Sequence, residues 1–203
     1  MTADPRLAGA RDDQQFRVLM VCTANICRSP LAEHLMRRAL EQRFGPDGAS
    51  RWTVRSAGTH AIVGAPIHEH AATVLAERGI VVPPTAARLL VPAMVERADL
   101  ILTASRAQRS IVVQAVPAAV RRVFTLRQFA RLCAAAPSTA DVSTGPSGLL
   151  DRAAAGRARV QPVDERAEVI ADPMGQPVDA FRAVAELTAR SIDDILRSLD
   201  TVR

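Results

Sequence analysis

The sequence contains no lysine and no tyrosine, and these two absences narrow its chemistry. Without lysine, the chain cannot form a nucleotide-binding Gly-Lys loop or a lysine Schiff base. The basic side chains that give the formal net charge of +5 are all arginines. A basic chain can bind nucleic acid, but aromatic residues make up only 3% of this one, and the arginines have no stacking residues between them. We therefore expect no nucleic-acid partner.

The chain also lacks long apolar runs and is poor in cysteine. No stretch approaches the roughly 20 apolar residues of a membrane span, and residues 1–15 contain no apolar segment typical of a signal sequence. The three cysteines are an odd number without a C-x-x-C pair, which argues against a disulfide framework and a zinc site. We expect a cytoplasmic protein with no membrane insertion, no metal and no other cofactor.

Residues 17–30 combine a short apolar run, a loop from a cysteine to an arginine, and a helix start. The β-rich run 18–21 predicts a buried strand, and Ser29-Pro30 predicts a helix cap followed by proline at the first helical position. Backbone amides at such a helix start bind anions. The thiol of Cys22 should lose its proton more easily than at the usual pKa of about 8.5, and Arg28 can hold two phosphate oxygens. We therefore expect a nucleophile, Cys22, and a phosphate cradle made by Thr23, Ala24, Asn25, Ile26, Cys27 and Arg28.

The string CTANICRSP, residues 22–30, resembles the phosphate loop of low-molecular-weight protein tyrosine phosphatases, whose pattern is C-x5-R-S. The SAGT at 56–59 resembles the motif that follows the second strand of that family. The resemblance implies that Cys22 attacks the phosphate of a tyrosine-phosphorylated protein while Arg28 holds it. It also implies that Asp172, in an Asp-Pro step before the last helix, is the general acid. Ser29 would then support the thiolate, and Ser56 would hydrogen-bond to Asn25.

Two departures from the family pattern bear on the substrate. Ala24 stands where the family usually has glycine, and a positive φ there would destabilise the loop by about 1–2 kcal/mol. Met174 and Ile62 stand where the family commonly has aromatic residues. A related phosphoarginine phosphatase branch typically has threonine in place of Ile26, which favours an aryl phosphate substrate here. Phosphoarginine hydrolysis nevertheless stays an alternative.

Two further alternatives remain open, together with the role of one cysteine. Arsenate reductases share the loop, but they use two further cysteines, and only Cys133 would be left for that relay. A non-catalytic phosphate-binding module is the other alternative. Cys27 should lie close to Cys22, where it could trap an oxidised nucleophile as a disulfide or simply pack beneath the loop.

The alternation of apolar segments predicts a single α/β domain over residues 16–203. Its core would be a doubly wound, four-stranded parallel sheet with helices on both faces and the ligand at the carboxyl ends of the strands. Residues 1–15 read as a disordered leader, and 134–167 as a flexible insertion that could contain a short helix over 149–157. The predicted strands are 18–21, 52–56, 99–103 and 121–126, and the predicted helices are 31–44, 69–78, 105–116, one around 129–132, and one from 177 onward.

Overall fold

The computed structural model describes residues 15–137 and 145–201. The leader predicted for residues 1–15 lies outside the described part, apart from Gln15. No helix in the described ranges is long and apolar enough to cross a membrane.

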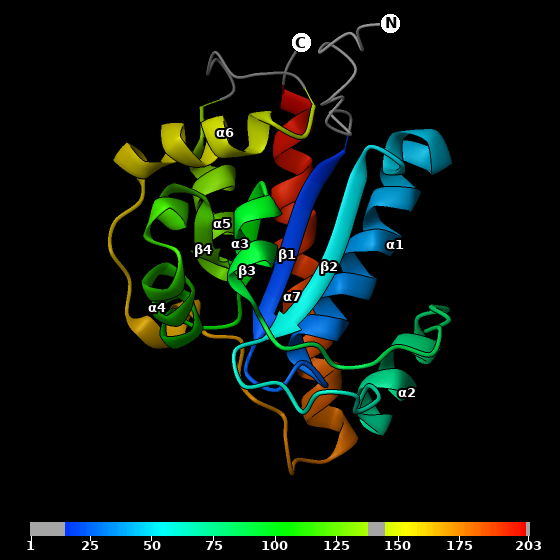
Figure 1. The fold of residues 1–203 in the computed structure, drawn as a ribbon. Coiled ribbons are helices and arrows are strands. Elements are labelled where there is room, and N and C mark those ends of the chain that lie inside the picture. The colour runs from blue at the N-terminus through cyan, green and yellow to red at the C-terminus, as the bar shows by residue number, and fades with distance from the viewer. Residues whose placement is uncertain (1–14, 138–144, 202–203) are drawn as a thin grey trace, which may run out of the picture.

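A four-stranded parallel sheet forms the centre of the molecule, as predicted (Figure 1). The strand order is β2-β1-β3-β4, so the chain steps outward in one direction from β1 to β2 and then continues on the other side of β1. The carboxyl ends of β1 and β3 therefore meet at the point where the order reverses, which is where ligands bind in open α/β sheets. The strands are β1 (Phe16–Cys22), β2 (Trp52–Gly58), β3 (Leu100–Thr103) and β4 (Val123–Thr125).

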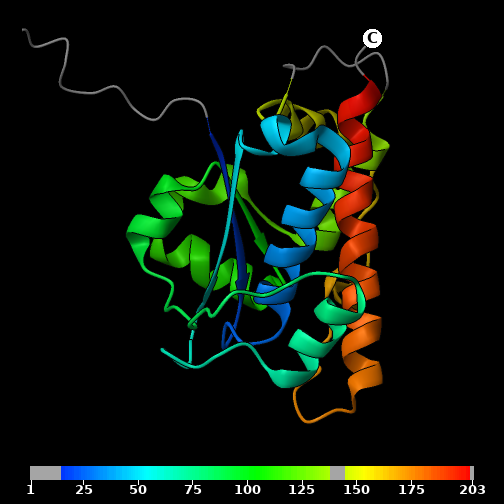
Figure 2. The same cartoon turned by 90° about the vertical axis from the view of Figure 1, so that its right-hand side faces the viewer.

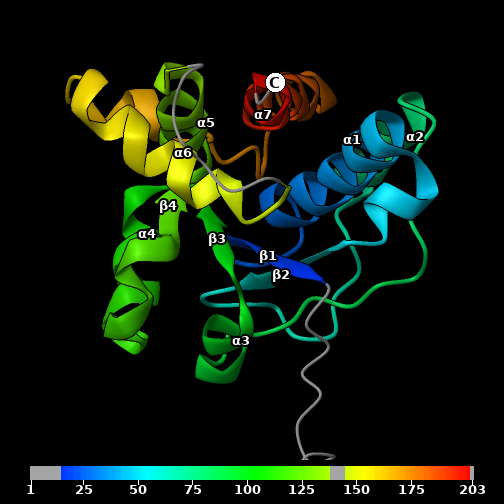
Figure 3. The same ribbon diagram turned by 90° about the horizontal axis from the view of Figure 1, so that it is seen from above.

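Both faces of the sheet are buried, which explains the unbroken apolar runs of its central strands. Along β1, Val18 and Met20 belong to the larger hydrophobic core, whereas Leu19 and Val21 belong to the smaller core on the opposite face. Figure 3 shows α1, α5 and α7 on the first face and α3 and α4 on the second. The helices are α1 (Arg28–Ala49), α2 (Glu69–Glu77), α3 (Pro92–Arg97), α4 (Arg106–Ala115), α5 (Leu126–Ala135), α6 (Gly148–Gly156) and α7 (Val178–Arg197).

Helices α1 and α7 lie side by side over the sheet (Figure 2). In α7, Phe181, Ile192 and Ile195 are fully buried, which confirms that its apolar stripe closes the core. This packing places the start of α7, and the loop before it, near the start of α1.

The first helix begins earlier than predicted, before both the expected cap and the proline. Arg28 is its first residue and Cys27 its N-cap, so the expected cap at Ser29 with proline at the first position was wrong. The hydroxyl of Ser29 is bound to other side chains instead. At the other end, Gly45 has φ 66° and ψ 179°, so the regular helix stops at the Gly-Pro step where its end was expected, and a short helical segment follows to Ala49.

The stretch predicted as an insertion contains a packed helix. Helix α6 corresponds to the short helix expected over 149–157, and its Leu149 and Ala153 are fully buried. Gly156 lies against the carbonyl of Leu132 in α5, and a side chain there would collide with it. Residues 138–144 lie outside the described part, and flexibility of the stretch 134–167 stays a prediction.

Candidate active site

The loop between β1 and α1 presents its backbone amides on one side. The carbonyl oxygens of Cys22, Thr23, Ala24 and Ile26 accept hydrogen bonds from amides of the segment 59–68, at 2.8 to 3.2 Å. In a trans peptide the N–H points away from the C=O. The amides that follow these carbonyls therefore point to the opposite side, next to the N-terminus of α1, where they can donate to a bound anion.

Asn25 holds the bend of this loop. Among the described non-glycine residues, Asn25 is the one with a positive φ, 58°. Asparagine tolerates this left-handed conformation well. Ala24 does not have a positive φ, so the strain considered for alanine at that position does not arise. The Asn25 amide nitrogen donates to the hydroxyls of Ser29 and Ser56, both at 2.9 Å, and its oxygen accepts from the backbone amide of Arg88 at 2.8 Å. The predicted hydrogen bond between Asn25 and Ser56 is therefore present.

Ser29 lies beside the candidate nucleophile. Its Oγ is 3.0 Å from Sγ of Cys22, and both residues are buried. The Ser29 hydroxyl accepts from Asn25 and lies 3.4 Å from the carbonyl of Ala57, so its proton can point at that carbonyl or at the sulfur. A hydrogen bond donated to the sulfur stabilises a thiolate more than a thiol.

Glu33 extends this buried polar network, and the sequence analysis did not find it. Its Oε2 accepts from the hydroxyl of Ser56 at 2.6 Å, and its carboxylate forms ion pairs with Arg37 at 2.7 Å and Arg88 at 3.6 Å. Glu33 is only 5% exposed, so these partners compensate for burying its charge. A glutamate on a helix gives no signal in the sequence until its partners on other elements are known.

Arg28 connects the loop with the candidate acid. Its Nη2 lies 2.5 Å from Oδ2 of Asp172 and 3.4 Å from Oγ1 of Thr23, while its Nη1 lies 3.5 Å from the carbonyl of Ile170. Within the described residues, the buried Nε of Arg28 has no hydrogen-bond partner. The structure thus brings Asp172, the predicted acid, into contact with Arg28 of the loop.

The other aspartates considered for the acid do not come to the loop. Asp99 accepts from a backbone amide at the start of β1, at the opposite end of that strand from Cys22. Asp164 caps the short 3₁₀ helix η4 (Glu165–Glu168), and Asp141 lies outside the described residues. Among the described candidates, Asp172 is therefore the one in contact with the cradle.

Thr23 is held by a residue that sequence reasoning missed. Gln108 of α4 is 6% exposed, and its Nε2 donates to Oγ1 of Thr23 at 3.0 Å. The Oε1 of Gln108 in turn accepts from the hydroxyl of Ser105 at 2.6 Å. Helix α4 thereby fixes the first loop residue from the second face of the sheet.

Cys27 is buried beside the loop that carries Asp172 and Met174. Its Sγ lies 3.2 Å from Sδ of Met174, and burial, together with the charges of Asp172 and Cys22, raises the pKa of the Cys27 thiol to about 12. Cys27 therefore carries its proton at neutral pH and can donate to the thioether. The three cysteines are free, and Cys133 is buried in α5 against the carbonyl of Leu149, so it is not part of this constellation.

The residues that replace the family's aromatics lie on the surface. Met174 is 45% exposed and Ile62 is 55% exposed, whereas Ile26 is buried in the loop. The amide of Ile62 bonds to the carbonyl of Ala24, so this exposed apolar side chain lies beside the loop, and we call Met174 and Ile62 the apolar rim. The rim can contact an apolar or aromatic group, but without ring stacking.

Comparison with known proteins finds one family that matches most of this chain. Residues 17–142 match the family model described as low molecular weight phosphotyrosine protein phosphatase. A probable low molecular weight protein-tyrosine-phosphatase, EpsP of Ralstonia nicotianae, is 38% identical over 120 residues, which cover 59% of this chain and 77% of that protein. A protein-arginine-phosphatase of Geobacillus stearothermophilus is 28% identical over 186 residues, covering 92% of this chain and 97% of that protein.

A solved structure agrees with the observed fold. The low molecular weight protein tyrosine phosphatase from T. tengcongensis superposes with a TM-score of 0.65 at 26% identity, covering 90% of this chain and 99% of that one. Asp172 lies beyond the residues that the family model matches, so its assignment rests on the contact with Arg28.

Proposed function

The chain belongs to the low molecular weight phosphotyrosine protein phosphatase family, and from this premise we propose that it hydrolyses phosphotyrosine on proteins through a phosphocysteine at Cys22. The observation that carries the proposal is the contact between Arg28 and Asp172, across 144 residues of sequence. It brings the guanidinium of Arg28 next to a carboxylate from another segment, which is the arrangement that a phosphate clamp and a general acid would need.

In the first half-reaction, the Cys22 thiolate attacks phosphorus and the bond from phosphorus to the aryl oxygen breaks. The guanidinium of Arg28 and the loop amides hold the equatorial oxygens, where negative charge is concentrated in the transition state. Asp172 gives its proton to the departing aryl oxygen, so the leaving group departs as a neutral phenol.

In the second half-reaction, water replaces the sulfur. Asp172, now ionised, takes a proton from the water as it attacks phosphorus, and the bond from sulfur to phosphorus breaks to release inorganic phosphate. The hydrogen bond from Ser29 to Cys22 stabilises the departing thiolate in this step. No oxidant or reductant is consumed.

The choice of phosphotyrosine over phosphoarginine rests on Ile26 and the apolar rim. A guanidinium leaving group is polar, and it would gain from a hydroxyl at position 26 that isoleucine does not supply. Phosphoarginine is the second candidate substrate, because the arginine phosphatase of G. stearothermophilus matches over nearly its whole length. We also propose a cytoplasmic location, which the odd number of free cysteines favours.

The proposed function is tested with Cys22→Ser and the matched control Cys133→Ala. Turnover of 4-nitrophenyl phosphate and of a phosphotyrosine peptide should disappear in Cys22→Ser and persist in Cys133→Ala. Full activity of Cys22→Ser would exclude this nucleophile. A phosphoarginine peptide of the same sequence serves as the third substrate, and a higher kcat/KM for it than for the phosphotyrosine peptide would assign the chain to the second candidate function.

A further inference from the structure

Glu168 is a buried carboxylate that the mechanism does not use. It is the last residue of η4 and is 2% exposed, four residues before the proposed acid Asp172. The neighbouring Glu165 of the same short helix is exposed. A buried carboxylate needs charged or hydrogen-bonding partners, and its partners show what it fastens.

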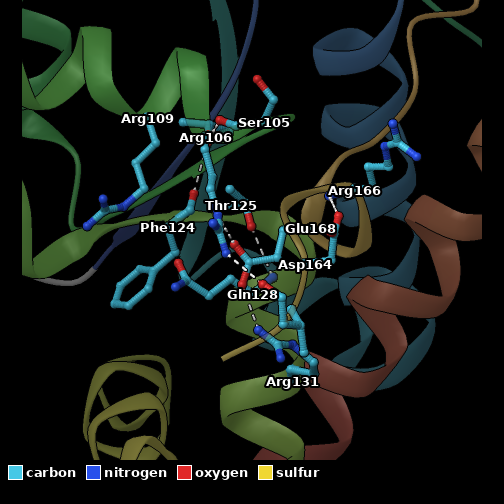
Figure 4. Close-up of polar contacts among 12 residues, drawn as sticks. Ser105, Arg106, Arg109, Phe124, Thr125, Gln128, Arg131, Asp164, Arg166 and Glu168 are labelled. Carbon is cyan, nitrogen blue, oxygen red and sulfur yellow. Dashed lines mark hydrogen bonds and ion pairs between the residues drawn. The ribbon is translucent and has the colours of Figure 1, made fainter. Parts of the chain in front are cut away.

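Two arginines from different helices hold the two carboxylate oxygens of Glu168. Nε of Arg106, the first residue of α4, donates to Oε2 at 2.7 Å, and Nη2 of Arg131 in α5 donates to Oε1 at 2.7 Å. Figure 4 shows both side chains converging on Glu168. Each carboxylate oxygen thus has its own charge-assisted donor, and the position of Glu168 relative to α4 and α5 is fixed.

The same two arginines also hold the chain just before η4. Nη2 of Arg106 lies 3.2 Å from the carbonyl of Val163, and Nη1 of Arg131 lies 3.4 Å from the carbonyl of Gln161. The segment 161–168 is therefore attached to α4 and α5 by the side chains of these arginines, because few of its own residues are buried.

From Glu168 the chain runs in a short, fixed path to the site. The amide of Ile170 donates to the carbonyl of Ala104 at 2.8 Å, directly after β3, and the Ile170 side chain is 2% exposed. The carbonyl of Ile170 faces Nη1 of Arg28, and Asp172 pairs with the other terminal nitrogen of that guanidinium. Only three residues separate Glu168 from Asp172, so a shift at one end is transmitted to the other.

We propose that Glu168 is a positioning residue for the general acid: by binding Arg106 and Arg131 it holds the 161–172 segment so that Asp172 reaches the leaving oxygen. The inference rests on the proposed function and deepens it. Arg106 and Arg131 are 42% and 33% exposed, so both can turn toward water when the carboxylate is lost. Loss of Glu168 should therefore release the loop rather than unfold the core.

The test compares Glu168→Gln with Glu165→Gln, which removes the same charge from the exposed side of the same short helix. Substrates with a good and a poor leaving group, 4-nitrophenyl phosphate and phenyl phosphate, separate acid catalysis from phosphate binding. Glu168→Gln should lower kcat/KM on phenyl phosphate by about 10- to 100-fold, with a much smaller loss on 4-nitrophenyl phosphate. The ratio kcat/KM reports the first half-reaction, in which the leaving group departs, and not the hydrolysis of the phosphocysteine that both substrates share. Glu165→Gln should match the wild type on both.

A double-mutant cycle with Asp172→Asn shows whether Glu168 acts through the acid. In the Asp172→Asn background, Glu168→Gln should have no further effect on kcat/KM for phenyl phosphate. If the effects of the two substitutions multiply, or if Glu168→Gln keeps the wild-type kcat/KM, the positioning role would be overturned while the proposed function stays intact. An unchanged kcat/KM in Asp172→Asn alone would instead refute the acid assignment and with it this inference.

Thermal unfolding of each variant shows whether a loss of activity comes from a loss of folded protein. If Glu168→Gln does not fold, Arg131→Gln removes only one of the two donors and should show the same dependence on leaving group in a milder form. Equal losses of kcat/KM on both substrates in Arg131→Gln would mean that the cluster supports the fold alone, and the positioning role would be abandoned.

Discussion

Asp172 occupies a donor of Arg28 that a bound phosphate would also use. Asp172 is 48% exposed, and its ion pair with the nearly buried Arg28 is the contact that ties the acid to the cradle. A carboxylate held at this distance acts as an internal competitor for the anion. Substrate binding must therefore free Arg28, and the released Asp172 carboxylate must take up a proton before it can protonate the leaving oxygen.

This competition predicts two opposite effects of Asp172→Asn. Turnover should fall by about 10²- to 10⁴-fold because the acid is lost. Inorganic phosphate should bind about two- to fivefold more tightly, because a partly exposed ion pair of this kind contributes up to about 1 kcal/mol. Steady-state kinetics with phosphate as a competitive inhibitor measures both quantities. The exposed Asp179→Asn should change neither, and weaker phosphate inhibition of Asp172→Asn would contradict the competition.

Cys27 lies in the same small loop as Cys22, and its raised pKa determines how fast it can act as a trap. After mild peroxide treatment, activity should return with dithiothreitol in the wild type but not in Cys27→Ser, since a disulfide from Cys27 prevents further oxidation of the Cys22 sulfenic acid. The attacking species is the Cys27 thiolate.

With a pKa raised to about 12, the thiolate fraction of Cys27 rises about tenfold per pH unit between pH 7 and 9. The recoverable fraction after a fixed peroxide exposure should therefore increase with pH in the wild type. Equal recovery by both proteins at every pH would leave Cys27 as a packing residue.

At the scale of elements, the end of β2 lies directly against the backbone of the loop between β1 and α1. A Cβ on Gly58 would collide with the carbonyl of Thr23 and come within 2.9 Å of the amide nitrogen of Asn25. Both contacts are with backbone, which cannot turn away as a flexible side chain could. The loop can adopt its conformation only because the last residue of this strand has no side chain.

Gly58→Ala should therefore displace the loop and lower kcat/KM by about tenfold or more, in addition to destabilising the fold by about 1–3 kcal/mol. Gly156→Ala is the matched control, because its Cβ would collide with the backbone of α5 far along the chain from the loop. It should destabilise the protein similarly but leave kcat/KM of the folded enzyme unchanged. Thermal melts give the unfolding temperature of each variant, and kcat/KM is then measured well below both temperatures. Equal kcat/KM in Gly58→Ala and Gly156→Ala would show that the loop absorbs the added methyl group.

The elements differ in how far the sequence predicted them. The four strands and the helices after them were predicted because their apolar patterns are local, and the loop because its cysteine, asparagine and arginine have a fixed spacing. Glu33, Gln108 and Glu168 could not be found in this way, because each acts through partners on other elements. The start of α1 was misplaced for the same reason, since the hydroxyl of Ser29 binds Cys22 across the loop and does not cap the helix.

At the scale of the whole molecule, a ligand that binds only the folded cradle should stabilise the entire chain. Inorganic phosphate at 100 times its dissociation constant should raise the free energy of unfolding by about 2.7 kcal/mol, which for a chain of this length is a shift of about 5 to 10 °C in Tm. Arg28→Lys should lose most of this shift, because lysine cannot bind two phosphate oxygens in a planar fork. The surface variant Arg182→Lys should keep it. A shift that survives in Arg28→Lys would place the phosphate elsewhere.

The contacts of the site also differ in their separation along the chain, and this bears on the order in which they form. Those that shape the cradle join residues 7, 31 and 63 positions apart, whereas the ion pair between Arg28 and Asp172 spans 144. Closing a longer loop costs more conformational entropy, so the contact between distant residues is expected to form later. Chains of this size commonly fold through intermediates. An intermediate with β1, β2 and α1 in place but the 161–172 segment still undocked would bind phosphate and be unable to protonate a leaving group. During refolding, protection of the Cys22 thiol by phosphate would then return before turnover does.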